Sequence, residues 1–403
     1  MPALTPIGEI FDLSGGQASD GLLDALASGR ITLRSKLRFW VANASDAGAS
    51  QAFSLGARLG YLTQDFRGFQ AFIEGNHVEV FTPNDFFDGV NDNTDLTLVA
   101  DVEQTELNQA WVQYGRSRKD FEFNLRAGRQ ATAAIDQRFI GSSGSRQGEQ
   151  TFDAIAFASR FGADRRVSFE YGYIDKVQRI FDVDALDYKS DSHTLRLGYV
   201  SDGIGTLSAF ALLLDLKDSA PELSNQTYGI SVDQRRVASD RVSVVYSLGF
   251  AVQADYGSNP TDYSAASVYA EGGAAIPDLG IVSVGYELSG SDEGDASFQY
   301  SLTTGQRIHR LSDTFITTPD DGLEDFFVNY ELPSSPSGLM GELNFHYYRS
   351  EEDGRDLGTE YNLNLTKLLS PNLSATLLAS YFDTSSAANP NLFLANLELN
   401  FSF

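Results

Sequence analysis

Cations stand at every second position in one short segment near the start of the chain. Arg34, Lys36 and Arg38 alternate there with apolar residues such as Leu37 and Phe39. Successive side chains of a β-strand point to opposite faces, so the three cations would share one face. A row of cations in a narrow passage gives anions a low-energy path, and the planar fork of arginine can bind both oxygens of a carboxylate. The segment therefore indicates binding or conduction of anionic solutes.

The elements that must position these cations show the same two-residue period. In the last segment Leu397, Leu399 and Phe401 share one face, while Asn396 and Glu398 share the other. Comparable segments run over roughly 9–13 residues, which is long for a soluble strand and sufficient to cross a bilayer at a tilt. A membrane barrel turns its apolar face towards lipid and its polar face inward. We therefore predict an all-β fold, a transmembrane antiparallel β-barrel.

The number of strands and the lengths of the connections favour this architecture. The period predicts about 18 strands, an even number, as in bacterial outer-membrane barrels. Connections after even-numbered strands are short and those after odd-numbered strands are mostly longer, as expected for short periplasmic turns and long extracellular loops. The predicted strands are 30–42, 52–64, 67–80, 104–117, 120–131, 149–160, 166–177, 191–201, 205–217, 226–237, 241–254, 263–275, 279–290, 325–333, 338–349, 358–369, 372–383 and 391–403.

Composition narrows the class of protein further. The 403 residues include no cysteine and carry a formal net charge of −26, which argues against disulfide scaffolds, thiol chemistry and nucleic-acid binding. No apolar run of about 18 residues is present, so no helical membrane span is expected. We expect residues 1–29 to form a periplasmic tail or a small plug helix and residues 30–403 to form the barrel.

Strand parity assigns more charged side chains to the lumen. Arg58, Arg126 and Arg196 lie on the polar faces of early strands, whereas late strands carry acids such as Glu342 and many asparagines at that parity. We therefore predict a lumen that is basic on its early strands and acidic or amide-rich on its late ones. The cations would either select anions or pair with lumen acids such as Glu170 to hold the wall.

One stretch carries a more specific pattern. Blocks at 104–111, 128–130, 136–141 and 146–153 read QTELNQAW, GRQ, DQRFIG and RQGEQTFD. Together they resemble the alginate-export family of outer-membrane porins, and the resemblance covers nearly the whole chain after about residue 30. It implies an 18-stranded barrel that conducts an anionic, carboxylate-bearing sugar polymer through an electropositive constriction.

The resemblance also implies which residues form this constriction. They are Arg129, Arg138 and Arg146, with Asp136, Glu149 and Asp153 as their partners. Arg129 presents a conflict, because strict alternation from Leu125 places it on the lipid side. We expect a β-bulge at Gly128 to turn Arg129 into the lumen.

Three functions agree with these patterns. The first is a passive channel for diffusion or export of anionic solutes such as uronate or alginate-like polysaccharide or oligosaccharides. The second is a less selective small-solute porin with a transverse charge field. The third is a surface receptor or adhesion barrel that uses the long loops at 81–103 and 291–324.

The predicted partners and location follow from the barrel. We expect contacts with membrane lipids, lipopolysaccharide and an anionic sugar or small solute in the bacterial outer membrane, and no nucleic acid. The terminal Phe403 would be recognised by the barrel-insertion machinery. The four histidines form no local catalytic pattern, and no Walker, dinucleotide or zinc motif is present, so we expect no enzyme activity, cofactor or metal.

Overall fold

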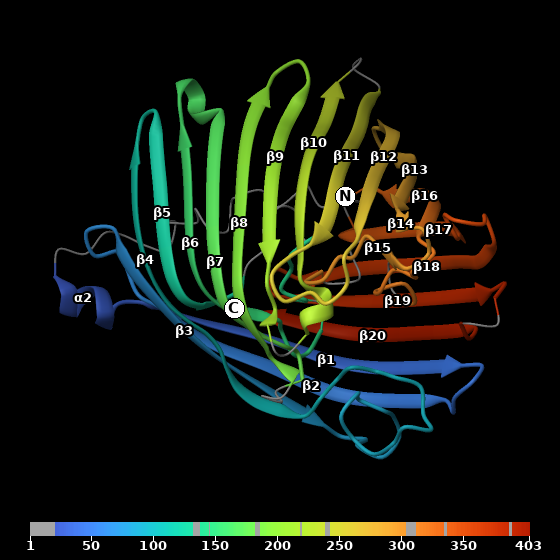
Figure 1. The fold of residues 1–403 in the computed structure, drawn as a ribbon. Coiled ribbons are helices and arrows are strands. Elements are labelled where there is room, and N and C mark those ends of the chain that lie inside the picture. The colour runs from blue at the N-terminus through green and yellow to red at the C-terminus, as the bar shows by residue number, and fades with distance from the viewer. Residues whose placement is uncertain are drawn as a thin grey trace.

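Eighteen antiparallel strands form one closed barrel in the computed structural model, which describes residues 21–131, 138–144, 146–181, 186–217, 220–237, 242–303, 312–333, 337–386 and 389–403. Each long strand pairs with its neighbours in the chain, and β1 pairs with β20 to close the ring (Figure 1). The bounds are β1 Arg30–Ala44, β2 Ser50–Leu62, β3 Phe69–Val80, β4 Gln104–Arg118, β5 Phe121–Gln130, β6 Thr151–Phe161, β7 Val167–Gln178, β8 Tyr188–Ser201, β9 Gly205–Leu214, β10 Asn225–Val237, β11 Ser243–Asp255, β12 Ser264–Ile276, β13 Gly280–Ser289, β16 Leu323–Leu332, β17 Leu339–Arg349, β18 Asp356–Ser370, β19 Leu373–Thr384 and β20 Leu392–Ser402.

Each strand has an apolar outer face and a mostly polar inner face, as the two-residue period predicts. Leu397 is 54% exposed on the outer face of β20, whereas its neighbours Asn396 and Glu398 are buried inside. The same division holds round the ring, because lipid replaces water at the outer wall and favours apolar side chains there. The predicted 18-stranded membrane barrel is therefore confirmed. Outward apolar residues include Ile31, Leu59, Ile73, Leu125, Ile155, Leu197, Ile230, Val284 and Leu399.

Short and long connections lie at opposite rims of the barrel. Counted in order round the barrel, the even-numbered strands are followed by short connections, for example 119–120 after β4 and 202–204 after β8. Long connections such as 81–103 after β3 and 131–150 after β5 follow odd-numbered strands. We take the short connections as the periplasmic turns. The long connection 290–322 carries a small hairpin of β14 (Ser291–Asp292) and β15 (Ala296–Ser297). Two short 3₁₀ turns, η1 (Ala163–Arg165) and η4 (Pro221–Leu223), lie in other connections.

A short helix precedes the barrel. Helix α2 (Leu22–Ala27) lies where β1 begins, at the periplasmic edge of the wall (Figure 1). The hydroxyl of Tyr61 donates to the carbonyl of Leu26, and the amide of Gln64 donates to Ala25 O at 3.1 Å. These bonds hold the helix at the rim near the end of β2. Residues 1–20 of the segment expected to form a tail or small plug helix lie outside the described residues. No helix within the described residues is long and apolar enough to cross a membrane.

Three long connections fold inward and fill part of the extracellular half of the lumen. Phe86 and Val99 from 81–103 pack on wall residues of β1 to β3. Phe139 from 131–150 packs with Tyr300 from 290–322 against β6 to β11. Phe315 packs against inward residues of β17 and β19. Strand alternation predicts a polar lumen, whereas these clusters place apolar side chains within its extracellular half.

Candidate functional site

The inward connections 131–150 and 290–322 meet inside the barrel. Ile140 and Leu302 form an isolated parallel β-bridge, and the amide of Gly141 donates to Leu302 O at 3.0 Å. The side-chain amide of Gln150 donates to Gly141 O at 2.8 Å and to Leu302 O at 3.2 Å. These hydrogen bonds, from the Gly141 backbone and the Gln150 side chain, tie the two segments together across the lumen and narrow the path through the barrel.

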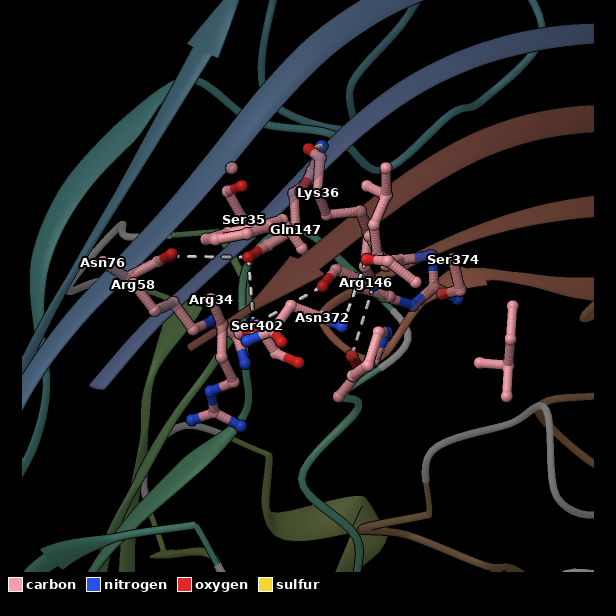
Figure 2. Close-up of a pocket in the computed structure, with 18 residues that line it drawn as sticks. Arg34, Ser35, Lys36, Arg58, Asn76, Arg146, Gln147, Asn372, Ser374 and Ser402 are labelled. Atoms are coloured by element: carbon pink, nitrogen blue, oxygen red, sulfur yellow. Dashed lines mark hydrogen bonds between the residues drawn. The ribbon is translucent and has the colours of Figure 1, made fainter.

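One cavity lies on the periplasmic side of this narrowing. Its volume is about 330 Å³, and its lining includes Arg34, Lys36, Arg58 and Arg146. Figure 2 shows these cations round the same space, carried by β1, β2 and the inward segment 146–150. Strand alternation explains the first two, because both lie on the inward face of β1. Residues separated widely in sequence therefore converge on one basic surface.

The cations of the periplasmic cavity are held by acids from other elements. Arg34 Nη2 lies 2.9 Å from an oxygen of Glu74 on β3, and the Arg34 side chain remains 50% exposed. Arg58 Nη1 lies 3.0 Å from Glu149 Oε2. The side-chain amide of Asn108 joins the two acids, donating to Glu74 at 2.7 Å and to Glu149 at 2.8 Å. Arg34 thus combines a fixed position with an exposed guanidinium.

Lys36 is held differently from these arginines. Its ammonium donates to the carbonyl of Gly144 in the inward segment at 3.3 Å. The side-chain amide of Gln147 donates back to Lys36 O at 3.1 Å. These bonds cross-link the first strand to the segment that narrows the lumen.

A second cavity of about 470 Å³ opens on the extracellular side of the narrowing. Arg38, Arg146 and Arg179 border it together with Asp101 and Asp313. Arg146 is therefore common to both cavities and lies at their junction. Much of the remaining lining is apolar and includes Trp40, Phe87, Phe181, Leu98, Ile316 and Leu394.

Arg38 forms the most enclosed ion pairs of the site. Its side chain is 3% exposed and lies 2.8 Å from Asp101 and 2.7 Å from Glu398. Ser54 donates to the second oxygen of Asp101 at 2.7 Å. Both acids are buried, so each depends on this guanidinium for compensation. The geometry fits structural support better than direct contact with a passing solute.

Arg146 pairs with Asp313 across the narrowing. The two side chains are 19% and 22% exposed, and Asp313 Oδ1 is buried without a hydrogen-bond partner. Burial raises the pKa of Asp313, although the neighbouring Arg146 acts in the opposite direction. The pair joins segment 146–150 to the connection 290–322, and the carboxylate of Asp313 offsets the positive charge of Arg146.

Arg179 was not among the site residues proposed from the sequence, although it borders the extracellular cavity. It follows β7 and donates to Gln150 Oε1 at 2.8 Å, and its guanidinium lies 4.8 Å from the ring of Tyr188. Burial, with a smaller contribution from Arg146, lowers the pKa of Arg179. Within the described residues no carboxylate forms an ion pair with it. Strand parity could not have found it, since it lies beyond the strand end.

Arg126 and Arg196 point inward, as predicted, but border neither cavity. Arg126 donates to Gln113 Oε1 at 2.8 Å and lies 4.1 Å from the ring of Trp111. Arg196 lies 2.9 Å from Glu170 on the neighbouring strand. Both are engaged with the wall itself.

Arg138 reaches the opposite wall of the barrel. It forms an ion pair with Glu287 on β13, and its guanidinium lies 4.0 Å from the ring of Tyr269 on β12. This contact anchors the far end of the inward connection. Asp136, predicted as a partner, lies outside the described residues.

Arg129 and Asp153 require a correction. No bulge occurs at Gly128, because the ladders of β5 with β4 and β6 continue in register through it. Arg129 therefore stays on the outward parity of Leu125, where it pairs with Asp153 at 2.8 Å. The positive φ of Gly128, 124°, distorts the strand locally without inserting a residue.

Two buried acids of the late strands, Glu271 and Glu360, have neutral hydrogen-bond partners. Glu271 accepts hydrogen bonds from Ser283 at 2.5 Å and from Asn329 at 3.3 Å. Glu360 accepts from the Ser312 hydroxyl at 2.7 Å. Hydroxyl and amide donors satisfy the oxygens but leave the negative charge in place. Within the described residues no group of His, Asp and Glu side chains is arranged to hold a metal ion.

Comparisons with known proteins agree with this architecture. A family model described as alginate export matches residues 29–291. Pseudomonas aeruginosa OpdK, solved with vanillate, matches at a TM-score of 0.70 and 14% identity over 93% of this chain and 98% of that chain. Acinetobacter baumannii OccAB4 matches at a TM-score of 0.70 and 12% identity, with 93% and 98% covered.

A third structure, Pseudomonas aeruginosa OccK9 (OpdG), gives a TM-score of 0.70 at 12% identity, with 94% of this chain and 99% of that chain covered. At these identities the similarity shows the fold. No curated protein sequence matches the chain. Because the family model covers more than half of the sequence, the resemblance noted in the sequence is confirmed. The chain belongs to the alginate-export family and is an 18-stranded porin of the bacterial outer membrane.

Proposed function

We propose that this porin conducts small amphipathic carboxylates, with Arg146 as the main contact for the carboxylate group. The observation that carries the proposal is the position of Arg146, which borders both the periplasmic and the extracellular cavity. A solute that passes between the cavities must approach this guanidinium. Its planar fork offers two donors to a carboxylate, and low-dielectric surroundings strengthen the attraction.

The size of the cavities supports a small solute. Their volumes of about 470 and 330 Å³ fall in the range of pockets for small molecules, roughly 300–1,000 Å³. The two inward connections are bonded to each other between the cavities. A polymer chain could pass only if the two inward connections separated at this bridge. A compact solute needs only local movement of side chains.

The lining of the extracellular cavity supports an apolar body on the solute. Trp40, Phe87 and Phe181 border the same space as Arg146 and Arg179. Aromatic walls beside fixed cations suit a ring that bears a carboxylate. OpdK, which shares the fold, was solved with vanillate, an aromatic carboxylate.

A uronate oligosaccharide is the second candidate, because the matching family is described as alginate export. Its repeated carboxylates could follow Arg179, Arg146 and Arg34 in turn. This candidate predicts block of small-ion current by uronate oligomers. The first candidate predicts saturable block by benzoate and little block by the oligomers.

Planar-bilayer recordings test the proposal. In the unmodified protein we expect anion preference and current block by benzoate but not by benzyl alcohol, which has the ring without the charge. Arg146→Gln should weaken the benzoate block by about tenfold or more, because a charge-assisted pair contributes about 1.5–3 kcal/mol. Arg196→Gln removes a lumen cation that borders neither cavity and should leave the block unchanged.

Other results would contradict the proposal. Cation preference in the unmodified protein, or equal block by benzoate and benzyl alcohol, would exclude a carboxylate channel. Stable conductance without block by any of these solutes would favour the less selective porin. A barrel closed to ions would favour a receptor or adhesion role for its long loops.

A further inference from the structure

The periplasmic rim carries a cluster of exposed cations outside the lumen. Arg67 lies in the turn between β2 and β3, Arg116 and Arg118 end β4, and Lys119 begins the next turn. All four side chains are exposed, and within the described residues none forms an ion pair with a carboxylate. In a chain with a net charge of −26 this local excess of positive charge is unusual.

The two turns that carry these cations lie side by side. The amide of Gly115 donates to the carbonyl of Gly68 at 2.9 Å, which joins β4 to the turn before β3. The guanidinium of Arg116 lies 5.0 Å from the ring of Tyr114 on the outward face. Arg67 lies 5.4 Å from the ring of Phe66. The cations therefore form one patch, held against aromatic side chains.

A belt of aromatic rings continues from this patch across the outer wall. The centroids of Phe69 and Tyr114 are 4.6 Å apart, and those of Tyr114 and Phe123 are 5.8 Å apart. Phe157 follows at 6.3 Å from Phe123, and Phe169 at 6.0 Å from Phe157. Aromatic belts of this kind lie at the membrane–water interface of barrels. The belt therefore places the patch at the level of lipid headgroups.

Nearby acids do not neutralise the patch. Glu122 is engaged with Arg160, 3.1 Å away, and with Arg165. Asp65 accepts a hydrogen bond from the amide of Gly68 at 3.0 Å. Asp120 is exposed in the same turn as Lys119. The four patch cations thus outnumber Asp65 and Asp120, the two nearby acids without an ion pair within the described residues.

We infer that this patch, Arg67, Arg116, Arg118 and Lys119, binds the phosphate of an anionic phospholipid in the periplasmic leaflet. The acyl chains would lie on the aromatic belt and the apolar wall above it. Charge complementarity selects the headgroup, and continuity with the lipid-facing wall selects a lipid over a soluble anion. Lipopolysaccharide faces the opposite rim, so its phosphates do not reach these turns.

Native mass spectrometry of the folded barrel in detergent tests the inference with phosphatidylglycerol and phosphatidylcholine as probes. The unmodified protein should retain phosphatidylglycerol in preference to phosphatidylcholine. Replacing all four patch cations with glutamine should reduce that ratio about tenfold or more, because each basic residue near a lipid surface contributes substantially to anionic-lipid binding. The single change Arg116→Gln should give a smaller reduction.

Lys367→Gln provides the matched control. Lys367 is on β18, near the periplasmic end of another part of the wall, and donates to the carbonyl of Ser337. This change should leave the lipid ratio intact. Heat-modifiability on gels and single-channel conductance show that each variant is folded. Equal retention of both lipids by the unmodified protein, or an unchanged ratio in the folded fourfold variant, would overturn the inference.

Discussion

The inward cations of the early strands differ from two inward acids of the late strands, Glu271 and Glu360, in how their charges are compensated. On the basic wall, each of Arg34, Arg38 and Arg58 contacts a carboxylate supplied by another element. On the acidic wall, Glu271 and Glu360 have hydroxyl and amide donors instead. Ion pairing offsets charge, whereas a neutral donor satisfies an oxygen and leaves the charge in place.

This difference changes how the lumen should be interpreted. The number of inward cations suggests a positive potential along the whole early wall. Arg34, Arg38 and Arg58, however, are ion-paired with carboxylates that offset their charge. Arg179 forms no ion pair with a carboxylate within the described residues, and Arg146, whose charge Asp313 offsets, borders both cavities. Selectivity should therefore depend on a few arginines, and stability on others.

The largest expected effect is on stability, at the buried end of the basic wall. Arg38→Ala removes the guanidinium between Asp101 and Glu398 and leaves two buried carboxylates without compensation. The free energy of unfolding should fall by about 3–5 kcal/mol. Urea unfolding of the barrel in lipid vesicles measures this change.

The control for that measurement is an exposed ion pair. Arg355 pairs with Asp321 at the extracellular surface, where solvent screens the interaction. Arg355→Ala should cost about 1 kcal/mol or less. Equal losses in the two variants would contradict the distinction between enclosed and exposed pairs.

The next effect concerns selectivity at the junction. Arg146→Gln removes one positive charge that borders both cavities. The ratio of anion to cation permeability should fall about three- to tenfold, since a unit charge at this range is worth about 1 kcal/mol or more in a partly dehydrated site. Reversal potentials under a salt gradient give the ratio, and an unchanged value would show that other cations set selectivity.

A smaller effect should follow acidification. Burial raises the pKa of Asp313, so this carboxylate takes up a proton at a higher pH than an ordinary aspartate. Protonation removes the charge that offsets Arg146, and anion preference should rise by about twofold as pH falls. A carboxyl whose native pKa is raised favours the folded state as pH decreases, so this titration does not itself unfold the barrel.

Asp313→Asn separates this group from others that titrate. The variant should show the higher anion preference already at neutral pH and little further change on acidification. Reversal potentials at neutral and mildly acidic pH provide the measurement. If the variant retained the full pH response, the titrating group would lie elsewhere in the lumen.

The smallest effect is expected at Arg129. This residue pairs with Asp153 on the outward parity of β5 and β6 rather than in the lumen. Arg129→Gln should change conductance and permeability ratio by less than about twofold, because the wall separates its charge from the ion path. A loss comparable to that of Arg146→Gln would place Arg129 in the pore after all.

Much of the barrel was predictable because strand alternation is local. The segment predicted at 30–42 is observed as Arg30–Ala44, and 391–403 as Leu392–Ser402. The inward faces of these strands were predicted correctly as well. The inward connections were not, since segments such as 131–150 have no period that shows on which side of the wall they lie. Arg129 was misplaced for a related reason: a glycine permits a bulge but does not require one.

The sequence alone determined the number of strands, which face of each strand is apolar, and that Arg34, Lys36 and Arg38 lie on the inner face of the wall. These properties follow from backbone geometry over a few residues and from the preference of lipid for apolar side chains. Only the tertiary structure decided which charges meet. Arg38 and Glu398 are 360 residues apart, and they become neighbours because the last strand closes the barrel against the first. The same closure, with the inward connections, brought Arg146 to the junction of two cavities.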